Sequence, residues 1–217
     1  AVTPETCSLS NGNISVLADN GTQPYTFAWT DDISTSTSAT NLAANTYTIT
    51  VTDANGCASS IAVVVDSFAS PQITNNTITP ETCSNSNASI AITTAGGTGA
   101  LVYTWSPNVG NAATVNNLAA GDYSVTITDT NFCTDTQTFT VTNTPSPTIA
   151  INQLTDANCG QANGSASVTV TNGTGALTYS WDGSPSDTNA ATGLAAGSYA
   201  VTVTDANNCT AVQPISI

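Results

Sequence analysis

A stretch that returns twice at a fixed distance constrains this chain more than any other feature. Residues 41–57 read NLAANTYTITVTDANGC, and close variants recur at residues 117–133 and 193–209, a step of 76 residues each time. From Tyr47 to Thr52, apolar and threonine side chains alternate, which predicts a strand with one face in a core and the other in water. The Asp-Ala-Asn-Gly that follows predicts a tight turn, because Asn and Gly adopt positive φ at little cost. With a second strand expected after the turn, the chain contains one hairpin three times.

The repeat divides the chain into three copies, which we place at residues 1–76, 77–152 and 153–217. Each copy holds about six or seven short alternating stretches separated by turn residues, and β-branched residues replace most helix formers. Pro71 and Pro147 mark short junctions rather than long flexible linkers. We therefore predict an all-β chain of three tandem immunoglobulin-like antiparallel β-sandwich repeats arranged end to end. Both chain ends fall in register with the repeat, so we expect a longer array.

The charge composition excludes several classes of function. The chain has 14 acidic residues and no Lys, Arg or His. Nucleic-acid binding and attraction to an anionic membrane both need cationic side chains. A Ser-His-Asp or Cys-His site needs histidine, and a Walker-type phosphate loop needs lysine. No hydrophobic run approaches the roughly 20 residues of a membrane helix, so no direct membrane insertion is expected.

The cysteines come as one pair per copy, with an internal spacing of 50 residues. Pairing within a copy treats the three copies alike, so we predict one disulfide in each, worth roughly 4 kcal/mol in the chain-entropy model. Two thiols per copy without histidine or a CxxC spacing make a poor zinc site. Disulfides imply an oxidising, extracellular compartment. The predicted pairs are Cys7 with Cys57, Cys83 with Cys133, and Cys159 with Cys209.

One acidic position recurs in all three copies, directly after the repeated strand. The carboxylate of such an Asp can cap its own turn by accepting backbone hydrogen bonds. Alternatively it can bind calcium together with the Asn two residues later, although calcium wants six or more oxygens and the spacing departs from the DxDxDG loop. Both interpretations stay open, and no other cofactor is expected. The residues concerned are Asp53, Asn55, Asp129, Asn131, Asp205 and Asn207.

Three further patterns are weighed against structural explanations. Asp31 and Asp32 supply the two carboxylates of a glycosidase, but the pair does not recur in the other copies, so we expect no catalytic residues and no enzyme. A Trp in the middle of each aromatic strand is expected in the core rather than stacked on a sugar. The outward threonines are compatible with ice binding, but also with a solvated sheet face or a lateral contact between chains. The core tryptophans are Trp29, Trp105 and Trp181.

Each copy resembles the SprB repeat of surface proteins of Bacteroidota. The resemblance rests on NGNISV (residues 11–16), GTQPYTFAW (21–29), the stretch at 41–57 and their later versions, and it extends over the whole chain. It implies giant gliding adhesins or extracellular filaments that are exported by a type IX system and hold surfaces, polysaccharide or other cells. The chain departs from the family in its complete lack of Lys, Arg and His.

We therefore expect a structural segment of a secreted, cell-surface adhesive fibre. It would act as a semi-rigid spacer and bundle with other copies as a homo-oligomer, attaching to surfaces or other cells. The alternative is that the repeats themselves are glycan- or cell-surface-binding modules. Glycan hydrolysis is disfavoured because no carboxylate pair repeats.

Overall fold

The computed structural model describes all 217 residues, and the chain is all-β as predicted. The regular elements are strands, apart from one short 3₁₀ helix, η1 (Thr30–Asp32). Strands form because Thr, Val, Ile and aromatic residues suit a pleated, half-buried surface, and Gly, Asn and Asp end each run. No helix in the structure is long and apolar enough to cross a membrane.

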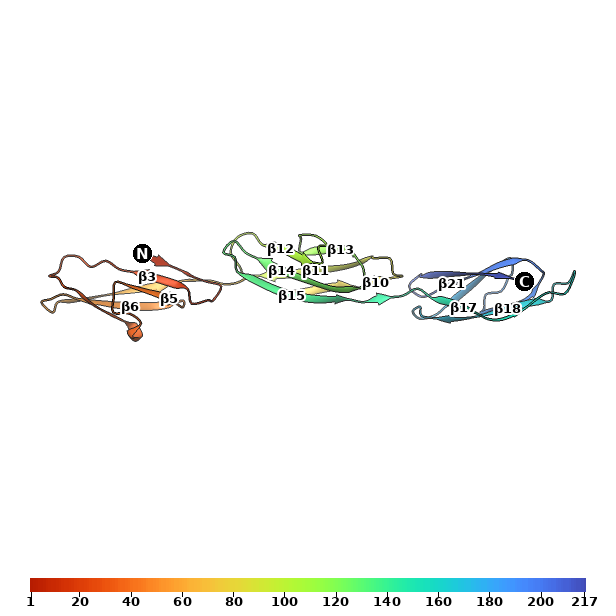
Figure 1. Ribbon diagram of the computed structural model, residues 1–217, viewed down its shortest axis with the longest axis horizontal. Helices are drawn as coiled ribbons and strands as arrows, with labels where there is room; N and C mark the ends of the chain where they lie inside the picture. The colour runs from red at the N-terminus through yellow and green to blue at the C-terminus, as the bar shows by residue number, and fades with distance from the viewer. The chain divides into compact units, whose positions relative to one another are not determined.

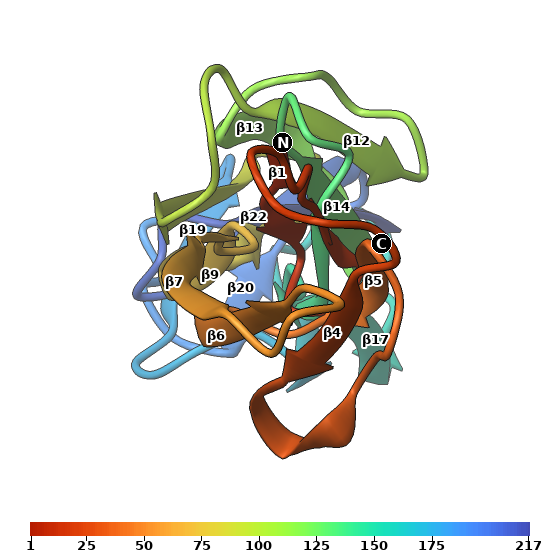
Figure 2. The ribbon, with the colours of Figure 1, turned by 90° about the vertical axis from the view of Figure 1, so that its left-hand side faces the viewer.

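The first copy folds into two three-stranded antiparallel sheets and one short parallel pair. The sheets have the strand orders β1-β3-β5 and β4-β6-β7, and β2 pairs with β8 in parallel (Figure 2). The strands are β1 (Val2–Thr3), β2 (Glu5–Thr6), β3 (Gly12–Ser15), β4 (Thr26–Trp29), β5 (Ser38–Leu42), β6 (Asn45–Thr52), β7 (Ala58–Val65) and β8 (Ser67–Phe68).

The second copy repeats this arrangement. Its sheets have the orders β9-β11-β13 and β12-β14-β15, with β10 and β16 as the parallel pair. The strands are β9 (Gln72–Thr79), β10 (Glu81–Thr82), β11 (Ala88–Ala95), β12 (Val102–Ser106), β13 (Thr114–Leu118), β14 (Gly121–Thr128), β15 (Thr134–Val141) and β16 (Asn143–Thr144).

The third copy has the two sheets but no parallel pair. Their orders are β17-β18-β20 and β19-β21-β22 (Figure 1). The strands are β17 (Thr148–Thr155), β18 (Gly164–Thr171), β19 (Thr178–Asp182), β20 (Ala190–Leu194), β21 (Ser198–Thr204) and β22 (Thr210–Ser216). The repeated hairpin predicted from the sequence is β6–β7 in the first copy and β21–β22 in the third, each joined through a continuous antiparallel register.

The strands group into two compact units, and the middle copy contributes to both. One unit comprises Ala1–Asn76, Ile92–Ala113 and Ser124–Thr138, and the other comprises Thr77–Ala91, Thr114–Tyr123 and Phe139–Ile217. Strands β9 and β17 also run across the predicted copy boundaries after residues 76 and 152. The boundaries of the three copies stay a prediction, and the copies are used below as the unit of comparison along the sequence.

Each tryptophan lies in the core of its copy. Trp29, Trp105 and Trp181 are 4%, 3% and 4% exposed, and each indole Nε1–H donates to a backbone carbonyl 2.8–3.0 Å away. The hydrogen bond removes the cost of burying the polar N–H, so the ring can serve as an apolar plug. In the first copy the ring belongs to a cluster with Ile14 and Ile49, both fully buried.

A tyrosine near the start of each repeated strand fixes the corner that leads into it. The hydroxyl of Tyr47 donates to the carbonyl of Ala43 at 2.9 Å, and Tyr123 and Tyr199 repeat the bond four residues upstream. A tyrosine bonded to the backbone a few residues before it resembles the tyrosine corner of immunoglobulin sandwiches. Together with the paired sheets and buried tryptophans, this feature identifies the copies as immunoglobulin-like.

Candidate functional site: the sulfur-bridged joints

The structure contradicts the predicted cysteine pairing. The two disulfides join Cys7 to Cys133 and Cys83 to Cys209, each across a sequence separation of 126 residues and with a Cα–Cα distance of 5.2 Å. Each bond therefore connects the first cysteine of one copy to the second cysteine of the next copy. The remaining two of the six predicted disulfide cysteines, Cys57 and Cys159, are free and exposed. The prediction of one disulfide within each copy was wrong.

The physical reason is the position of the two cysteines within one sandwich. The N–H of Cys7 donates to the carbonyl of Phe68 at the end of β8, close to where Val65 pairs with Asn45. Cys57 lies at the opposite end of β6, beyond Thr52. The eight residues of β6 span about 26 Å at roughly 3.3 Å each, whereas a disulfide needs Cα atoms within about 7 Å. An intra-copy bond is geometrically impossible.

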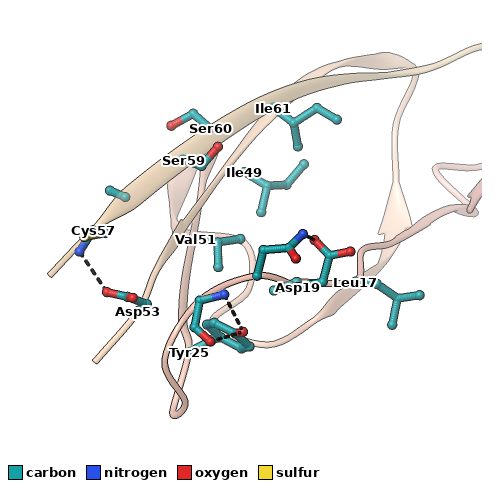
Figure 3. A pocket seen from close by; sticks show the side chains of 14 residues that line it. Leu17, Asp19, Tyr25, Ile49, Val51, Asp53, Cys57, Ser59, Ser60 and Ile61 are labelled. Atoms are coloured by element: carbon teal, nitrogen blue, oxygen red, sulfur yellow. Dashed lines mark hydrogen bonds between the residues drawn. The ribbon is translucent and has the colours of Figure 1, made fainter. Parts of the chain in front are cut away.

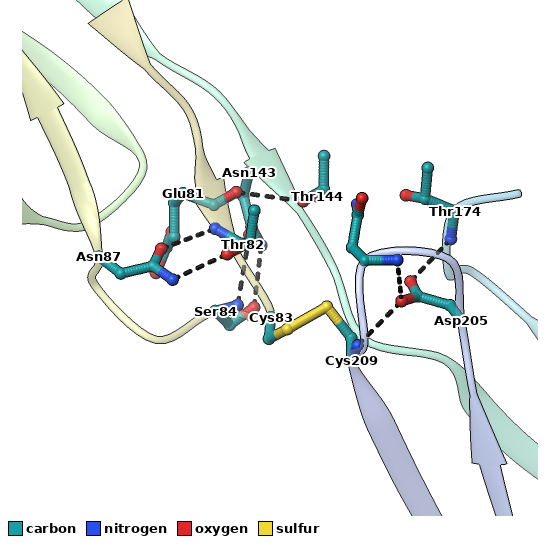
Figure 4. Close-up of a disulfide and its surroundings, with 11 residues drawn as sticks. Glu81, Thr82, Cys83, Ser84, Asn87, Asn143, Thr144, Thr174, Asp205 and Cys209 are labelled. Atoms are coloured by element: carbon teal, nitrogen blue, oxygen red, sulfur yellow. Dashed lines mark hydrogen bonds between the residues drawn. A yellow bond between two sulfur atoms is a disulfide. The ribbon is translucent and has the colours of Figure 1, made fainter.

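The first cysteine of each joint sits in a short loop, residues 5–11 or 81–87, which we call the cysteine loop. A buried glutamate holds it: Glu81 is 5% exposed and accepts the N–H groups of Ser86 at 2.7 Å and Ala120 at 2.8 Å (Figure 4). Asn87 closes the loop by accepting the Thr82 N–H and donating to the Thr82 hydroxyl, at 2.8 and 2.7 Å.

The same bonds recur in the first copy, where Glu5 accepts from Ser10 and Ala44, and Asn11 binds Thr6. The third copy keeps the closing asparagine, since Asn163 accepts the N–H of Asn158 at 2.8 Å, but it has alanine in place of the glutamate.

The second cysteine of each joint sits in the turn of the repeated hairpin, residues 129–133 or 205–209, which we call the capped turn. Asp129 Oδ1 accepts the N–H groups of Asn131 and Cys133 at 2.9 Å each, and its Oδ2 accepts the N–H of Thr98 at 2.9 Å. Asp205 makes the equivalent three bonds in the third copy (Figure 4). The recurrent aspartate thus caps its turn and also fixes the backbone that presents the sulfur.

The charge state of these aspartates follows from the same bonds. Burial of Asp129 and of Asp205 raises the pKa of each carboxyl, but the backbone N–H groups of the turn stabilise the anion, and the net pKa lies below its ordinary value. In the first copy the N–H groups of Thr22 and Cys57 lower the pKa of Asp53 in the same way. All three carboxylates are therefore ionised at neutral pH.

The arrangement does not fit the predicted calcium site. Both oxygens of each aspartate are engaged by backbone N–H groups. No group of three or more Asp, Glu, Cys or His side chains gathers anywhere in the structure to hold a metal. Calcium prefers six or more oxygens that face it together. The residues concerned serve the turn, as the capping interpretation expected, and calcium dependence stays an untested prediction.

A junction proline seals each joint. Pro71 and Pro147 are buried, and each packs on the glycine that precedes the aromatic strand of the following copy. A Cβ at Gly97 would lie 3.0 Å from Pro71 Cβ, and one at Gly173 would lie 3.1 Å from Pro147 Cγ. Contacts this close leave room for hydrogen alone, and both glycines have positive φ.

Other predicted sites do not assemble. Asp31 and Asp32 are exposed on η1 and belong to no joint. The buried tryptophans present no ring face on which a sugar could stack. Sequence reasoning missed Glu5 and Glu81, although the recurrence of TPETC at the 76-residue step was a usable signal. It also placed no role on Asp135, whose Oδ2 accepts the N–H of Ile73 at 2.8 Å beside the junction proline.

Comparisons with known proteins point to one repeat family. The model of the SprB repeat matches residues 1–32, 75–110 and 151–186. A comparison with curated protein sequences finds no match.

Among solved structures, the chain is similar to the N-terminal eight immunoglobulin domains of Down syndrome cell adhesion molecule, with 13% identity and a TM-score of 0.49, covering 99% of this chain and 35% of that one. It is also similar to the three-domain ectodomain of mouse nectin-like molecule 4, with 9% identity and a TM-score of 0.45, covering 99% of this chain and 96% of that one. The chain thus spans about a third of the first of these molecules.

Proposed function

Because this chain carries three SprB repeats, we propose that it is a load-bearing spacer segment of a secreted, non-enzymatic adhesive fibre on a cell surface. The observation that supports the proposal is the pairing of cysteines between neighbouring copies rather than within them. A covalent bond at each joint keeps neighbouring copies attached even when their sandwiches unfold, which is what a segment under tension needs.

The pairing limits how far the unfolded chain can be stretched. Force applied to the two ends passes from Cys7 to Cys133, back along the chain to Cys83, and from there to Cys209. The path contains 6 residues before Cys7, the 50 residues between Cys83 and Cys133, and 8 residues after Cys209. At roughly 3.5 Å per residue this is about 230 Å, against about 760 Å for the reduced chain.

The location and partners proposed here follow from the chemistry of the joints and from the family. Disulfides persist in oxidising compartments, which fits a protein exported to the cell surface. Export by a type IX system from a member of the Bacteroidota, and bundling of several chains through their threonine-rich faces, complete the proposal. Surfaces, polysaccharide or other cells are the targets of the whole fibre.

A spacer and a ligand-binding module are separated by a binding measurement on this chain. We expect no retention of the isolated chain on polysaccharide or on whole cells, because the tryptophans are buried and no carboxylate pair repeats. Saturable binding would instead support the alternative that the copies are glycan- or cell-surface-binding modules.

Single-molecule extension of the oxidised chain tests the load-bearing role. We expect full unfolding to add contour only up to about 230 Å, and reduction to release the chain to about 760 Å. The matched control is the double variant Cys57→Ser/Cys159→Ser, which removes both free thiols and leaves both disulfides intact. Its extension should equal that of the oxidised parent. An increase by two loops of 50 residues would contradict the proposal, because it would mean that the removed cysteines were bonded within their copies.

A further inference from the structure

The first copy contains a cleft at the place where the other two copies hold a junction proline. The cleft has a volume of about 370 Å³ and runs beside Leu17, Tyr25, Val51, Cys57 and Ile61 (Figure 3). A second cleft of about 380 Å³ adjoins it and shares Leu17, Ala18 and Tyr25. Leu17 is fully exposed and Ile61 is 57% exposed, so the surface is apolar and uncovered.

The later copies show what covers the equivalent surface. Gly21 of the cleft corresponds, at steps of 76 residues, to Gly97 and Gly173. Pro71 packs on Gly97 and Pro147 on Gly173, and both prolines belong to a Ser-Pro-x-Ile sequence that enters the first strand of the copy. In two of three copies, an extended proline-containing segment therefore occupies this place.

The strand edge beside the cleft is also unpaired in the first copy. In the third copy β17 pairs with β18 along its whole length, from Thr148↔Thr171 through Ile151↔Val168 and beyond. The residues that correspond to 168–171 are 16–19, and β3 ends before them at Ser15 because β1 reaches only to the partners of Ile14 and Asn13. An open edge with free N–H and C=O groups is a template for one more extended segment.

The sulfur register points to the same surface. Cys133 and Cys209 are each 1% exposed and bonded, whereas Cys57, which occupies the same position in its capped turn, is exposed and free. At the other end of the pattern, Cys159 occupies the position of Cys7 and Cys83 and is likewise exposed and free. The two unpaired thiols are thus one of each kind that the joints combine.

We propose that the cleft, the edge at residues 16–19 and Cys57 form an acceptor site for the joint-forming parts of another SprB copy. The edge and cleft take an extended Ser-Pro-x-Ile segment, with the proline against the ring of Tyr25, since aromatic walls commonly receive proline. Cys57 bonds the cysteine of a loop like the one that carries Cys159. The same chain therefore has an acceptor at its first copy and a donor thiol at its third, so that joints can continue in both directions.

The covalent step requires an oxidant, which we take to be a small disulfide such as oxidised glutathione. The Cys57 thiolate attacks the oxidant's disulfide and releases one glutathione thiol, leaving a mixed disulfide. The thiolate of the donor cysteine then attacks the Cys57 sulfur and releases the second glutathione thiol. The two protein thiols lose two electrons and two protons in total, and the oxidant gains both.

Two complementary variants of the full chain test the proposal. Cys57→Ser leaves only the donor thiol, and Cys159→Ser leaves only the acceptor thiol. The variants are mixed in a glutathione redox buffer and resolved on a non-reducing gel, with and without a synthetic peptide of residues 142–152 (TNTPSPTIAIN), which supplies the junction segment. We expect the mixture to form a Cys57–Cys159 heterodimer about tenfold in excess of either homodimer, because docking raises the effective concentration of the matching thiol. The peptide should increase its yield, and a peptide with Pro147→Asp and Ile149→Asp should not.

Two results would overturn the proposal. Heterodimer and homodimers in the statistical proportion would show that the thiols are merely exposed and react without orientation. No heterodimer, although both thiols still react with a small alkylating reagent, would show that the acceptor surface does not dock the donor loop. Neither result bears on the load-bearing role, since the extension experiment is unaffected by removal of Cys57 and Cys159.

Discussion

Removing one inter-copy disulfide should destabilise the chain by an amount that its loop length predicts. The double variant Cys83→Ser/Cys209→Ser opens a loop of 126 residues and leaves no orphan thiol. In the chain-entropy model, closing such a loop is worth about 5 kcal/mol, and about 4 kcal/mol when the second copy stays folded and only some 57 residues are freed. The loss is close to the whole stability of a small domain, so the third copy should unfold first.

Urea unfolding followed by tryptophan fluorescence measures this effect, because Trp181 lies in the core of the third copy. With a slope of about 2 kcal/mol per M, the midpoint of the affected transition should fall by about 2 M. Cys57→Ser/Cys159→Ser is the matched control, since it also replaces two cysteines by serine but breaks no bond. The reasoning is refuted if the control loses as much stability as the test variant, or if the test variant loses less than about 1 kcal/mol.

Three further predictions concern the groups that shape the joints. Glu81→Ala should destabilise the second cysteine loop by about 1–3 kcal/mol, because it strands the N–H groups of Ser86 and Ala120 without an acceptor; urea unfolding that shows no change would contradict this role. The capping aspartates have a pKa below the value of about 3.9 in the unfolded chain, so they contribute stability above pH 4 that is lost as the pH falls through the folded pKa; Asp129→Asn should flatten the acid side of a plot of melting temperature against pH, and an unaltered slope would count against the cap. The melting temperature should be the same with a chelator as with added calcium, because the carboxylate oxygens are engaged by the turn, and a higher value in calcium would establish the metal site that the geometry does not support.

The sheets could be predicted from the sequence because their signals are local. Alternation from Tyr47 to Thr52 sets the two faces of a strand, and Asp53 to Gly56 supplies the turn, so the hairpin follows from neighbouring residues alone. The capping role of Asp53 was likewise within reach, since an aspartate can bond the backbone two residues ahead of it.

The cysteine pairing could not be predicted in the same way, because it depends on where a two-residue strand docks. Cys7 follows β2, and the sequence does not reveal that β2 pairs in parallel with β8 at the end of the sandwich opposite the capped turn. Spacings of 50 and of 126 residues fit the repeat equally well for the middle of an array and differ only at its ends. The argument from symmetry chose the intra-copy bond, and the length of β6 rules it out.

The buried glutamates illustrate the other limit. Glu5 and Glu81 look like ordinary surface charges in a chain of polar residues, since charged side chains are rarely buried. Their burial follows from loop backbone that turns its N–H groups inward, with positive φ at Cys83, Ser84 and Ser86 in the second copy. Such conformations are set by the packing around the loop, which no period in the sequence reports.

Peptide mapping of the oxidised, alkylated chain tests the central claim most directly. The chain has no Lys or Arg for trypsin, so it is cleaved with pepsin, whose acid pH also keeps free thiols protonated and prevents exchange. The account predicts linked peptides that contain Cys7 with Cys133 and Cys83 with Cys209, with the alkyl label on Cys57 and Cys159. Linked peptides that contain Cys7 with Cys57 or Cys83 with Cys133 would contradict it.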